Sequence, residues 1–322
     1  MTFFFDCRFI RVDHHDGISR FSAELFSAIS KQTNVTALVN DVAQLNSLPN
    51  GTKHLLVNDP TNPWLELWLP RKLNQEGATV VFSPMQTMGS VGKKYRLILT
   101  LHDLIYYKHR KPPSSLSWPL RLAWRLFHLS FTPVRILLNR ADAVVTISET
   151  TKGQIEANRL TRNSVHVVHN ASSLARSEFV KTQPQSKNLI YMGSFMPYKN
   201  VEVLIESMAQ LPDYTLTLCS KIEPGRKKQL LDGVAADVIQ RIHFTNGLSE
   251  SKYQEILDDG FALVTASKDE GFGIPVIEAM SRSVPVVISD LPIFREVAAK
   301  AGSYFDPESS KGFVEAVLQL EP

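Results

Sequence analysis

The stretch Lys268-Asp-Glu-Gly-Phe-Gly-Ile-Pro-Val-Ile-Glu278 decides how this chain is interpreted. Glu270 precedes a glycine loop, in which Gly271 and Gly273 let the backbone approach a ligand closely. The proline that follows suits the start of a helix and places Glu278 on its first turn. Free N–H groups and the positive end of a helix dipole favour phosphate there, and carboxylates accept hydrogen bonds from sugar hydroxyls. The stretch predicts a nucleotide-sugar site, with a surface loop capping a helix as the alternative.

The bulk composition is that of a soluble globular protein. The 322 residues are enough for about two domains, and 43% of them are hydrophobic against 21% charged. The chain has no apolar run of about 18 residues, so we expect no membrane-spanning helix. Its first residues, Met1 to Asp6, lack a basic region and predict a strand, not a signal peptide. Cys7 and Cys219 lack metal-ligand spacing, which favours a reducing, cytoplasmic location.

The net charge of +3 conceals an asymmetry between the two halves of the chain. Residues 1–172 carry 20 basic against 12 acidic side chains, whereas residues 173–322 carry 15 against 20. The excess is concentrated between Lys93 and Arg140, where ten bases accompany one acid. This polarity predicts an anionic partner for the first half, such as a membrane surface; we expect no nucleic acid.

Short β-branched runs alternate with amphipathic helical stretches along the whole chain. This alternation predicts an α/β fold with two Rossmann-like parallel-sheet domains facing a central cleft. We expect domain bounds of 1–172 and 188–322, joined by a linker at 173–187 that has no apolar periodicity. The predicted strands are 2–5, 35–39, 55–57, 79–82, 96–101, 143–147, 165–168, 189–192, 215–219, 242–244, 262–265 and 285–288.

Several motifs together resemble the family 4 retaining glycosyltransferases, which have the two-domain GT-B fold. The glycine-loop stretch and the strand Val284-Pro-Val-Val-Ile-Ser-Asp290 match the signature of that family. Leu101-His-Asp-Leu104 resembles its His-Asp loop, and Gly193-Ser-Phe-Met-Pro-Tyr-Lys-Asn200 resembles the start of its donor domain. Asp16-Gly-Ile-Ser-Arg20 resembles its N-terminal glycine loop. The combination indicates the family but neither the donor nor the acceptor.

The resemblance implies a role for each matching residue. Lys199 would neutralise the leaving diphosphate, Glu270 would contact the transferred sugar, and Glu278 would hold the ribose hydroxyls. His102 would donate to the sugar or phosphate, and Asp103 would orient its loop. The other residues implied in donor binding are Gly17, Ser194, Lys221, Gly271, Phe272, Gly273 and Ile274.

The resemblance also implies a reaction without a metal or other cofactor. The chain contains no Asp-x-Asp pair of the kind that holds a divalent ion on a sugar diphosphate. His14-His15 and the pair His166 and His169 are better explained as loop and strand residues than as metal ligands. Retention could use a carboxylate nucleophile, but the roles implied for Glu270 and Glu278 favour a same-face displacement.

The segment from Ser117 to Phe131 has the pattern of a basic amphipathic helix. Arg121, Arg125 and His128 fall on one face, and apolar side chains fall on another, namely Leu120, Trp124, Phe127 and Phe131. Such a helix can lie in a membrane interface and attract anionic lipid. A core-facing helix with a solvated basic face is the equally weighted alternative. A membrane position would favour a polyprenyl-linked saccharide acceptor.

Three features depart from the family pattern. Ser194 stands where many members have an arginine that pairs with the later lysine, so Lys199 acts alone or with Lys221. Ser283 replaces a glycine. The sequence ends at Pro322, where members usually continue into a further helix that crosses back onto the first domain.

The sequence therefore predicts a retaining glycosyltransferase that moves a sugar from a UDP- or GDP-sugar to a saccharide or lipid-linked saccharide, in cell-envelope polysaccharide synthesis. We expect a cytoplasmic enzyme at the inner face of the membrane. A non-catalytic nucleotide-sugar-binding subunit and a nucleotide-sugar epimerase of the same fold are the alternatives.

Overall fold

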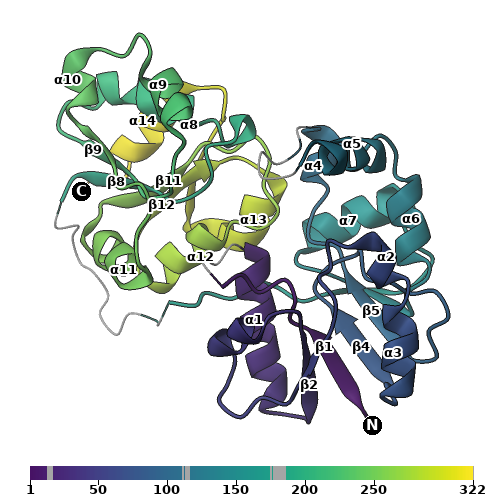
Figure 1. Cartoon of the computed structure of the whole chain (residues 1–322). Coiled ribbons are helices and arrows are strands. Elements are labelled where there is room, and N and C mark those ends of the chain that lie inside the picture. The colour runs from purple at the N-terminus through teal and green to yellow at the C-terminus, as the bar shows by residue number, and fades with distance from the viewer. Residues whose placement is uncertain (13–16, 111, 113–116, 175, 177–185, 322) are drawn as a thin grey trace. The chain divides into compact units, whose positions relative to one another are not determined.

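The chain folds into two compact units, Met1–Asn170 and Ala171–Pro322 (Figure 1). The computed structural model describes residues 1–12, 17–110, 112, 117–174, 176 and 186–321. Most of the predicted linker lies outside these residues, so the predicted domain bounds of 1–172 and 188–322 stay a prediction.

The first unit is built on a parallel seven-stranded sheet with the order β3-β2-β1-β4-β5-β6-β7. Its strands are β1 (Phe3–Asp6), β2 (Val35–Val39), β3 (His54–Leu56), β4 (Val80–Ser83), β5 (Arg96–Thr100), β6 (Ala143–Thr146) and β7 (Val165–Val167). Its helices are α1 (Gly17–Ser30), η1 (Val42–Ser47), α2 (Pro63–Glu66), α3 (Leu69–Gln75), α4 (Ile105–Lys108), α5 (Trp118–Phe127), α6 (Thr132–Leu138) and α7 (Glu149–Ala157).

The second unit repeats the design with a parallel six-stranded sheet of order β10-β9-β8-β11-β12-β13. Its strands are β8 (Asn188–Tyr191), β9 (Thr215–Leu218), β10 (Ile242–Phe244), β11 (Ala262–Thr265), β12 (Val286–Ser289) and β13 (Gly302–Phe305). Its helices are η2 (Pro197–Lys199), α8 (Val201–Ser207), η3 (Met208–Gln210), α9 (Pro224–Leu231), α10 (Ala236–Ile239), α11 (Glu250–Asp259), α12 (Ile274–Ser281), α13 (Pro292–Ala298), η4 (Ala299–Ala301) and α14 (Ser310–Leu318).

Both sheets are buried because helices cover both of their faces. In the second unit, α8 packs against α14 on one side of the strands, while α12 and α13 pack together on the other (Figure 1). The central strands β11 and β12 are buried at every position, which explains why all their residues but the last, Thr265 and Ser289, are apolar. In the first unit, the ring of Phe5 stacks on Phe82 at 4.8 Å and meets the edge of Phe26 at 5.6 Å. Truncating such a buried ring costs about 3–5 kcal/mol.

Each strand predicted from the sequence is present, and no end is shifted by more than one residue. The sequence missed β13, whose residues are only half-buried except for Phe305. An edge strand of this kind lacks the apolar run that marks a central strand.

Both sheets contain a point at which the strand order reverses. It lies between β1 and β4 in the first unit and between β8 and β11 in the second. The connections that leave these two neighbouring strands cross to opposite faces of the sheet, so their first residues separate and leave a crevice. Ligands of open α/β sheets bind in that crevice, at the carboxyl ends of the strands.

Candidate functional site

A cavity of about 80 Å³ lies at the reversal point of the second sheet. Its walls come from β8 and the turn after it, from β11 and the loop after it, from the start of α12 and from α13. The lining residues are Tyr191, Met192, Gly193, Lys199, Leu263, Val264, Thr265, Glu270, Gly273, Pro275, Val276 and Phe294. Small-molecule sites typically enclose roughly 300–1,000 Å³. The cavity is therefore smaller than a typical small-molecule site. It brings together three predicted site residues: Lys199, Glu270 and Gly273.

Lys199 is presented by a tight turn between β8 and α8. Pro197 begins the single 3₁₀ turn, and Lys199 ends it. The next residue, Asn200, has the left-handed conformation, with φ at 53°, which asparagine adopts more readily than most residues. Its side-chain amide donates to the carbonyl of Pro307 at 2.7 Å, which fixes the turn against the loop after β13. The backbone that carries Lys199 is therefore held in one conformation.

Glu270 lies opposite Lys199 in the loop after β11. The Lys199 amino group forms an ion pair with Oε2 of Glu270, and the two side chains are 13% and 16% exposed. Oε1 accepts a hydrogen bond from the backbone N–H of Gly271 at 3.2 Å. Burial raises the pKa of Tyr191, and the negative charge of nearby Glu270 raises it further, so the Tyr191 hydroxyl stays protonated. The cavity thus holds one cation and one carboxylate, each in a fixed position.

Gly273 is required where α12 begins. Its φ is 89°, a conformation that side-chain-bearing residues rarely adopt. A Cβ at this position would lie 2.6 Å from Cε1 of Phe294, a residue of α13 that also lines the cavity. The glycine therefore lets the loop end against a packed aromatic ring. Pro275 follows within the first turn of α12, as the sequence predicts.

The remaining residues of the glycine loop are packed inward. Phe272 is 5% exposed, and Gly271 is also buried, whereas Ile274 is half-buried. Glu278 is 1% exposed and interacts within the protein. It is the fifth residue of α12, so it lies on the second turn and not on the first. The predicted roles of these four residues in donor binding stay predictions.

Ser194 and Lys221 lie outside the cavity lining. Both side chains are exposed. The carbonyl of Ser194 accepts a hydrogen bond from the hydroxyl of Tyr191 at 2.6 Å, which holds the loop after β8. The aliphatic part of Lys221 lies over Gly247, where an added Cβ would come within 2.9 Å of its Cγ. The predicted roles of Ser194 and Lys221 in donor binding stay predictions.

His102 follows β5 in the first unit and is held on several sides. Its Nε2 donates to the carbonyl of Pro84 at 2.8 Å, and its ring meets the edge of Phe21 at 5.0 Å. Asp103 accepts a hydrogen bond from the N–H of Ile105 at 3.0 Å. This contact links Asp103 to the first residue of α4, and the loop-orienting role predicted for Asp103 stays a prediction.

Gly17 is the exposed first residue of α1. The preceding residues, including His14-His15 and Asp16 of the predicted glycine loop, lie outside the described residues. The predicted contact of Gly17 with donor phosphates therefore stays a prediction.

The basic segment folds differently from its predicted amphipathic pattern. His128 was expected on the basic face of α5, but it is 9% exposed and packs among the rings of Trp124, Tyr106 and Tyr107. Burial lowers its pKa. Trp124 contributes its own ring to this packing, so the predicted apolar face of α5 turns mostly toward the protein. The reason is α4, whose two tyrosines cover that face.

The opposite face of α5 carries a second apolar row that the sequence interpretation missed. We call it the α5 row: Trp118, Leu122, Leu126 and Leu129, which are 77%, 50%, 58% and 57% exposed. Spacings of four residues align Trp118, Leu122 and Leu126 on one side of α5, and Leu129 follows them in the turn after the helix. The exposed Arg121 and Arg125 flank the row along the same helix.

One depression in the first unit is not a candidate ligand site. A depression of about 430 Å³ lies at the amino ends of β1 and β2, lined by residues such as Phe3, Val35 and Lys53. It is at the wrong end of the sheet for a ligand site of this fold.

Sequence reasoning missed two residues of the cavity wall, Tyr191 and Phe294. The position of Tyr191 at the end of β8 was the available signal.

No helix within the described residues is long and apolar enough to cross a membrane. This finding agrees with the expectation from the sequence.

Two family models together match almost the whole chain. Residues 21–176 match the model described as Glycosyltransferase Family 4, and residues 175–321 match Glycosyl transferases group 1. The sheet orders, the cavity at the reversal point and these matches define a GT-B protein with two Rossmann-like α/β units. The chain belongs to the family 4 glycosyltransferases.

Curated relatives and solved structures agree with this assignment. The O-antigen chain mannosyltransferase RfbU of Salmonella typhimurium is 28% identical over 191 residues, covering 58% of this chain and 53% of the relative. The chain thus spans about half the length of that relative. O-antigen chain mannosyltransferase B of Escherichia coli is 29% identical over 136 residues, covering 40% and 35%.

Structural similarity extends over nearly the whole chain. Sucrose-phosphate synthase from Thermosynechococcus elongatus has a TM-score of 0.73 at 16% identity, covering 99% of this chain and 89% of the other. Anabaena HepE in complex with UDP-glucose has a TM-score of 0.71 at 16% identity, with the same coverage. These likenesses show the fold.

Proposed function

We propose that this protein is a retaining glycosyltransferase that moves a sugar from a nucleoside-diphosphate sugar to a saccharide or lipid-linked saccharide of the cell envelope. The observation that carries the proposal is the Lys199–Glu270 ion pair at the reversal point of the second sheet. A cation that the backbone already holds in place can stabilise the charge that develops on a departing diphosphate. The curated relatives, which are named as mannosyltransferases, favour a mannosyl donor.

The donor-side roles follow from the chemistry of the cavity. Lys199 exchanges its contact with Glu270 for a phosphate oxygen when the donor binds. The released carboxylate of Glu270 then accepts hydrogen bonds from hydroxyls of the transferred sugar. The start of α12 at Gly273 directs backbone N–H groups toward the second anionic group of the diphosphate.

The proposed reaction is a same-face displacement without a metal ion. The leaving phosphate takes the proton of the incoming hydroxyl, so Glu270 and Glu278 act in binding and not as nucleophiles. His102 contacts the donor from the first unit. Lys199 and the helix dipole of α12 balance the charge of the diphosphate, a task for which other sugar transferases use a divalent ion.

We place the acceptor at a membrane surface, to which the first unit binds through the α5 row. Interfacial helices combine exposed tryptophan and leucine with arginine, and each arginine near an anionic surface contributes about 1 kcal/mol. Arg121 and Arg125 supply this charge beside the row, within the basic segment Lys93–Arg140. The enzyme would then work on a polyprenyl-linked saccharide at the inner face of the cell membrane.

Donor hydrolysis and transfer provide the test. The protein is incubated with GDP-mannose or UDP-glucose, in EDTA, with and without a lipid-linked oligosaccharide, and nucleoside diphosphate release is measured. We expect release from one donor, its stimulation by the acceptor, and a product with the anomeric configuration of the donor in NMR spectra. An inverted product would refute retention, and dependence on added Mg²⁺ or Mn²⁺ would refute the metal-free mechanism.

A non-catalytic nucleotide-sugar-binding subunit is the second candidate, favoured by the exposed Ser194 in place of the family arginine. It predicts that a nucleoside diphosphate raises the melting temperature without any turnover of the sugar donor. Hydrolysis that is abolished by Glu270→Ala would exclude this candidate. Failure to bind UDP, GDP or ADP would refute both candidates.

A further inference from the structure

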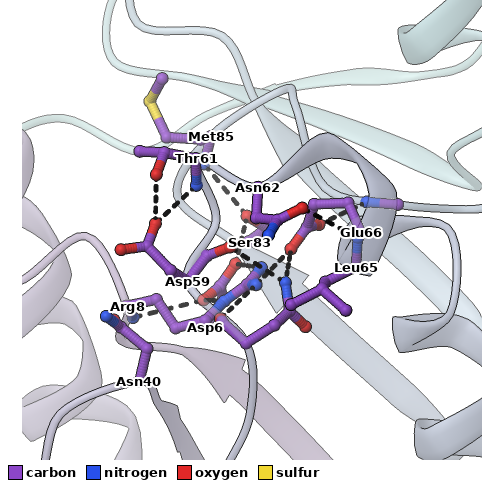
Figure 2. A network of polar contacts seen from close by, with 12 residues as sticks. Asp6, Arg8, Asn40, Asp59, Thr61, Asn62, Leu65, Glu66, Ser83 and Met85 are labelled. Atoms are coloured by element: carbon purple, nitrogen blue, oxygen red, sulfur yellow. Dashed lines mark hydrogen bonds and ion pairs between the residues drawn. The ribbon is translucent and has the colours of Figure 1, made fainter.

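Asp6, Arg8 and Glu66 form a buried ion triad at the reversal point of the first sheet (Figure 2). The Arg8 guanidinium donates from Nε to Oδ1 of Asp6 at 2.7 Å and from Nη2 to Oδ2 at 2.9 Å. Its Nη1 binds Glu66, and the side chain of Asn58 donates to the same Glu66 oxygen at 2.6 Å. The triad therefore joins the chain after β1 to the chain after β3.

Local sequence explains how these three residues meet. Asp6 is the last residue of β1, and Arg8 lies two positions further along the same turn. Glu66 ends the single-turn helix α2, which Asn62 begins by accepting hydrogen bonds from the N–H groups of Trp64 and Leu65.

Burying the three charged groups of the triad is unfavourable if the triad serves only to stabilise the fold. Asp6 is 0% exposed, Arg8 4% and Glu66 7%, so two carboxylates and one guanidinium lie out of water. Burial alone would lower the pKa of Arg8, but the two carboxylates reverse the effect and raise it. Replacing a buried ion network by packed apolar residues is often neutral or stabilising by about 1–4 kcal/mol. The buried charges are therefore weak evidence for a purely stabilising role, and a positioning role is the alternative.

The triad fixes both ends of the loop that follows β4. At the first end, the hydroxyl of Ser83 donates to Oδ2 of Asp6 at 3.0 Å and accepts from the N–H of Met85 at 3.3 Å. At the other end, the N–H of Gly89 donates to Oε2 of Glu66 at 2.9 Å. Gly89 also lies against the Glu66 backbone, because an added Cβ would come within 1.9 Å of its carbonyl oxygen.

The fixed loop carries the hydrogen-bond acceptor of His102. The carbonyl of Pro84, directly after Ser83, accepts from Nε2 of His102 at 2.8 Å. This contact requires the proton on Nε2 and sets the plane of the ring. A shift of the Pro84 carbonyl would remove a contact that favours the Nε2–H tautomer and this ring orientation.

We infer that Asp6, Arg8 and Glu66 are positioning residues that hold the loop after β4 so that its Pro84 carbonyl orients His102. This inference rests on the proposed function for the role of His102 in catalysis. The charged side chains of the triad thus occupy the reversal point of the first sheet and support His102. In the second unit, a cavity lies at the corresponding point.

The test uses the full chain labelled with ¹⁵N-histidine, with the His102 signals assigned by their loss in His102→Gln. Glu66→Gln keeps the side-chain volume but can place an NH₂ group against the Gly89 N–H. Ser83→Ala cuts the link to Asp6 at the other end. The matched control is Glu76→Gln, an exposed carboxylate in the same unit.

We expect wild type and Glu76→Gln to show the Nε2–H tautomer of His102, and Glu66→Gln and Ser83→Ala to show a mixture of tautomers. In the transfer assay, Glu66→Gln and Ser83→Ala should each lose about 10- to 100-fold in kcat, with the KM for the donor unchanged. A misplacement of a catalytic group by about 1 Å has an effect of this size. Unchanged His102 signals in both folded variants would overturn the inference. If the tautomer shifts but wild type shows no transfer or hydrolysis, the proposed function fails and the positioning stands.

Discussion

The amino group of Lys199 and the carboxylate of Glu270 form an ion pair between the loops that follow β8 and β11. Because these strands are neighbours at the reversal point, their connections leave toward opposite faces, and the pair lies in the crevice between them. The pair holds each group in one conformation before a donor arrives. This preorganisation avoids part of the reorganisation that a solvated lysine would require.

Removal of the Lys199 amino group should slow the chemical step. We expect Lys199→Ala to lower kcat by about 100- to 1,000-fold, the loss seen when one preorganised electrostatic group is removed from a transition state. Steady-state kinetics, with whichever of GDP-mannose and UDP-glucose the protein hydrolyses, provide the measurement. Lys187→Ala removes a more exposed lysine that pairs with Glu321 in the same unit, and it should leave kcat unchanged. Equal kcat values for Lys199→Ala and wild type would contradict the role.

Replacement of Gly273 should destabilise the second unit and disturb the cavity. In Gly273→Ala the new Cβ meets Phe294 at 2.6 Å, and the backbone must keep a φ of 89°. We expect a loss of about 1–3 kcal/mol in the free energy of unfolding, measured by urea denaturation. Gly225→Ala is the matched control, because an added Cβ at this glycine of α9 meets nothing within 4 Å. Similar stabilities of the two variants would argue against strain at Gly273.

The α5 row should control binding to anionic vesicles. Leu122→Glu with Leu126→Glu places two carboxylates where the membrane interior would lie, so binding to phosphatidylglycerol vesicles should be lost in a sedimentation assay. Val42→Glu changes another exposed apolar residue of the first unit, 57% exposed, and should bind as wild type does. The melting temperatures should agree, because the altered side chains are solvent-exposed. Retained vesicle binding by the double variant would show that the row faces another partner.

His128 should make the first unit sensitive to acid. Its folded-state pKa is lowered by burial, so below the ordinary value of about 6.5 the unfolded chain binds more protons than the native one. Stability contributed by neutral His128 is therefore present above about pH 6.5 and is lost as the pH falls. The facing side chains, Tyr106, Tyr107 and Trp124, are uncharged at these pH values.

His128→Phe keeps an aromatic ring but removes this titration. Urea denaturation of both proteins at about pH 7.5 and about pH 5.5 gives the comparison. We expect wild type to lose more stability than the variant between the two values. An equal loss in both proteins would assign the acid sensitivity to other groups.

Much of the fold was predictable because its signals are local. Alternation of apolar strands with helical periodicity predicted both parallel sheets, and the glycine loop with its proline predicted the start of α12. The half-buried edge strand β13 was missed because it lacks that periodic signal. The sequence also predicted the polarity of the α5 segment but not its orientation, since tyrosines of α4 decide which face is covered.

The sequence by itself determined the family, the α/β architecture and the types of residue in the donor loop. Only the tertiary structure decided which of them meet. Lys199 and Glu270 are 71 residues apart, and Arg8 and Glu66 are 58 apart. A contact over such separations depends on the order of strands in a sheet, which brings distant loops to one edge. Local propensities do not encode that order, because the apolar pattern of a buried strand does not specify which neighbour it pairs with.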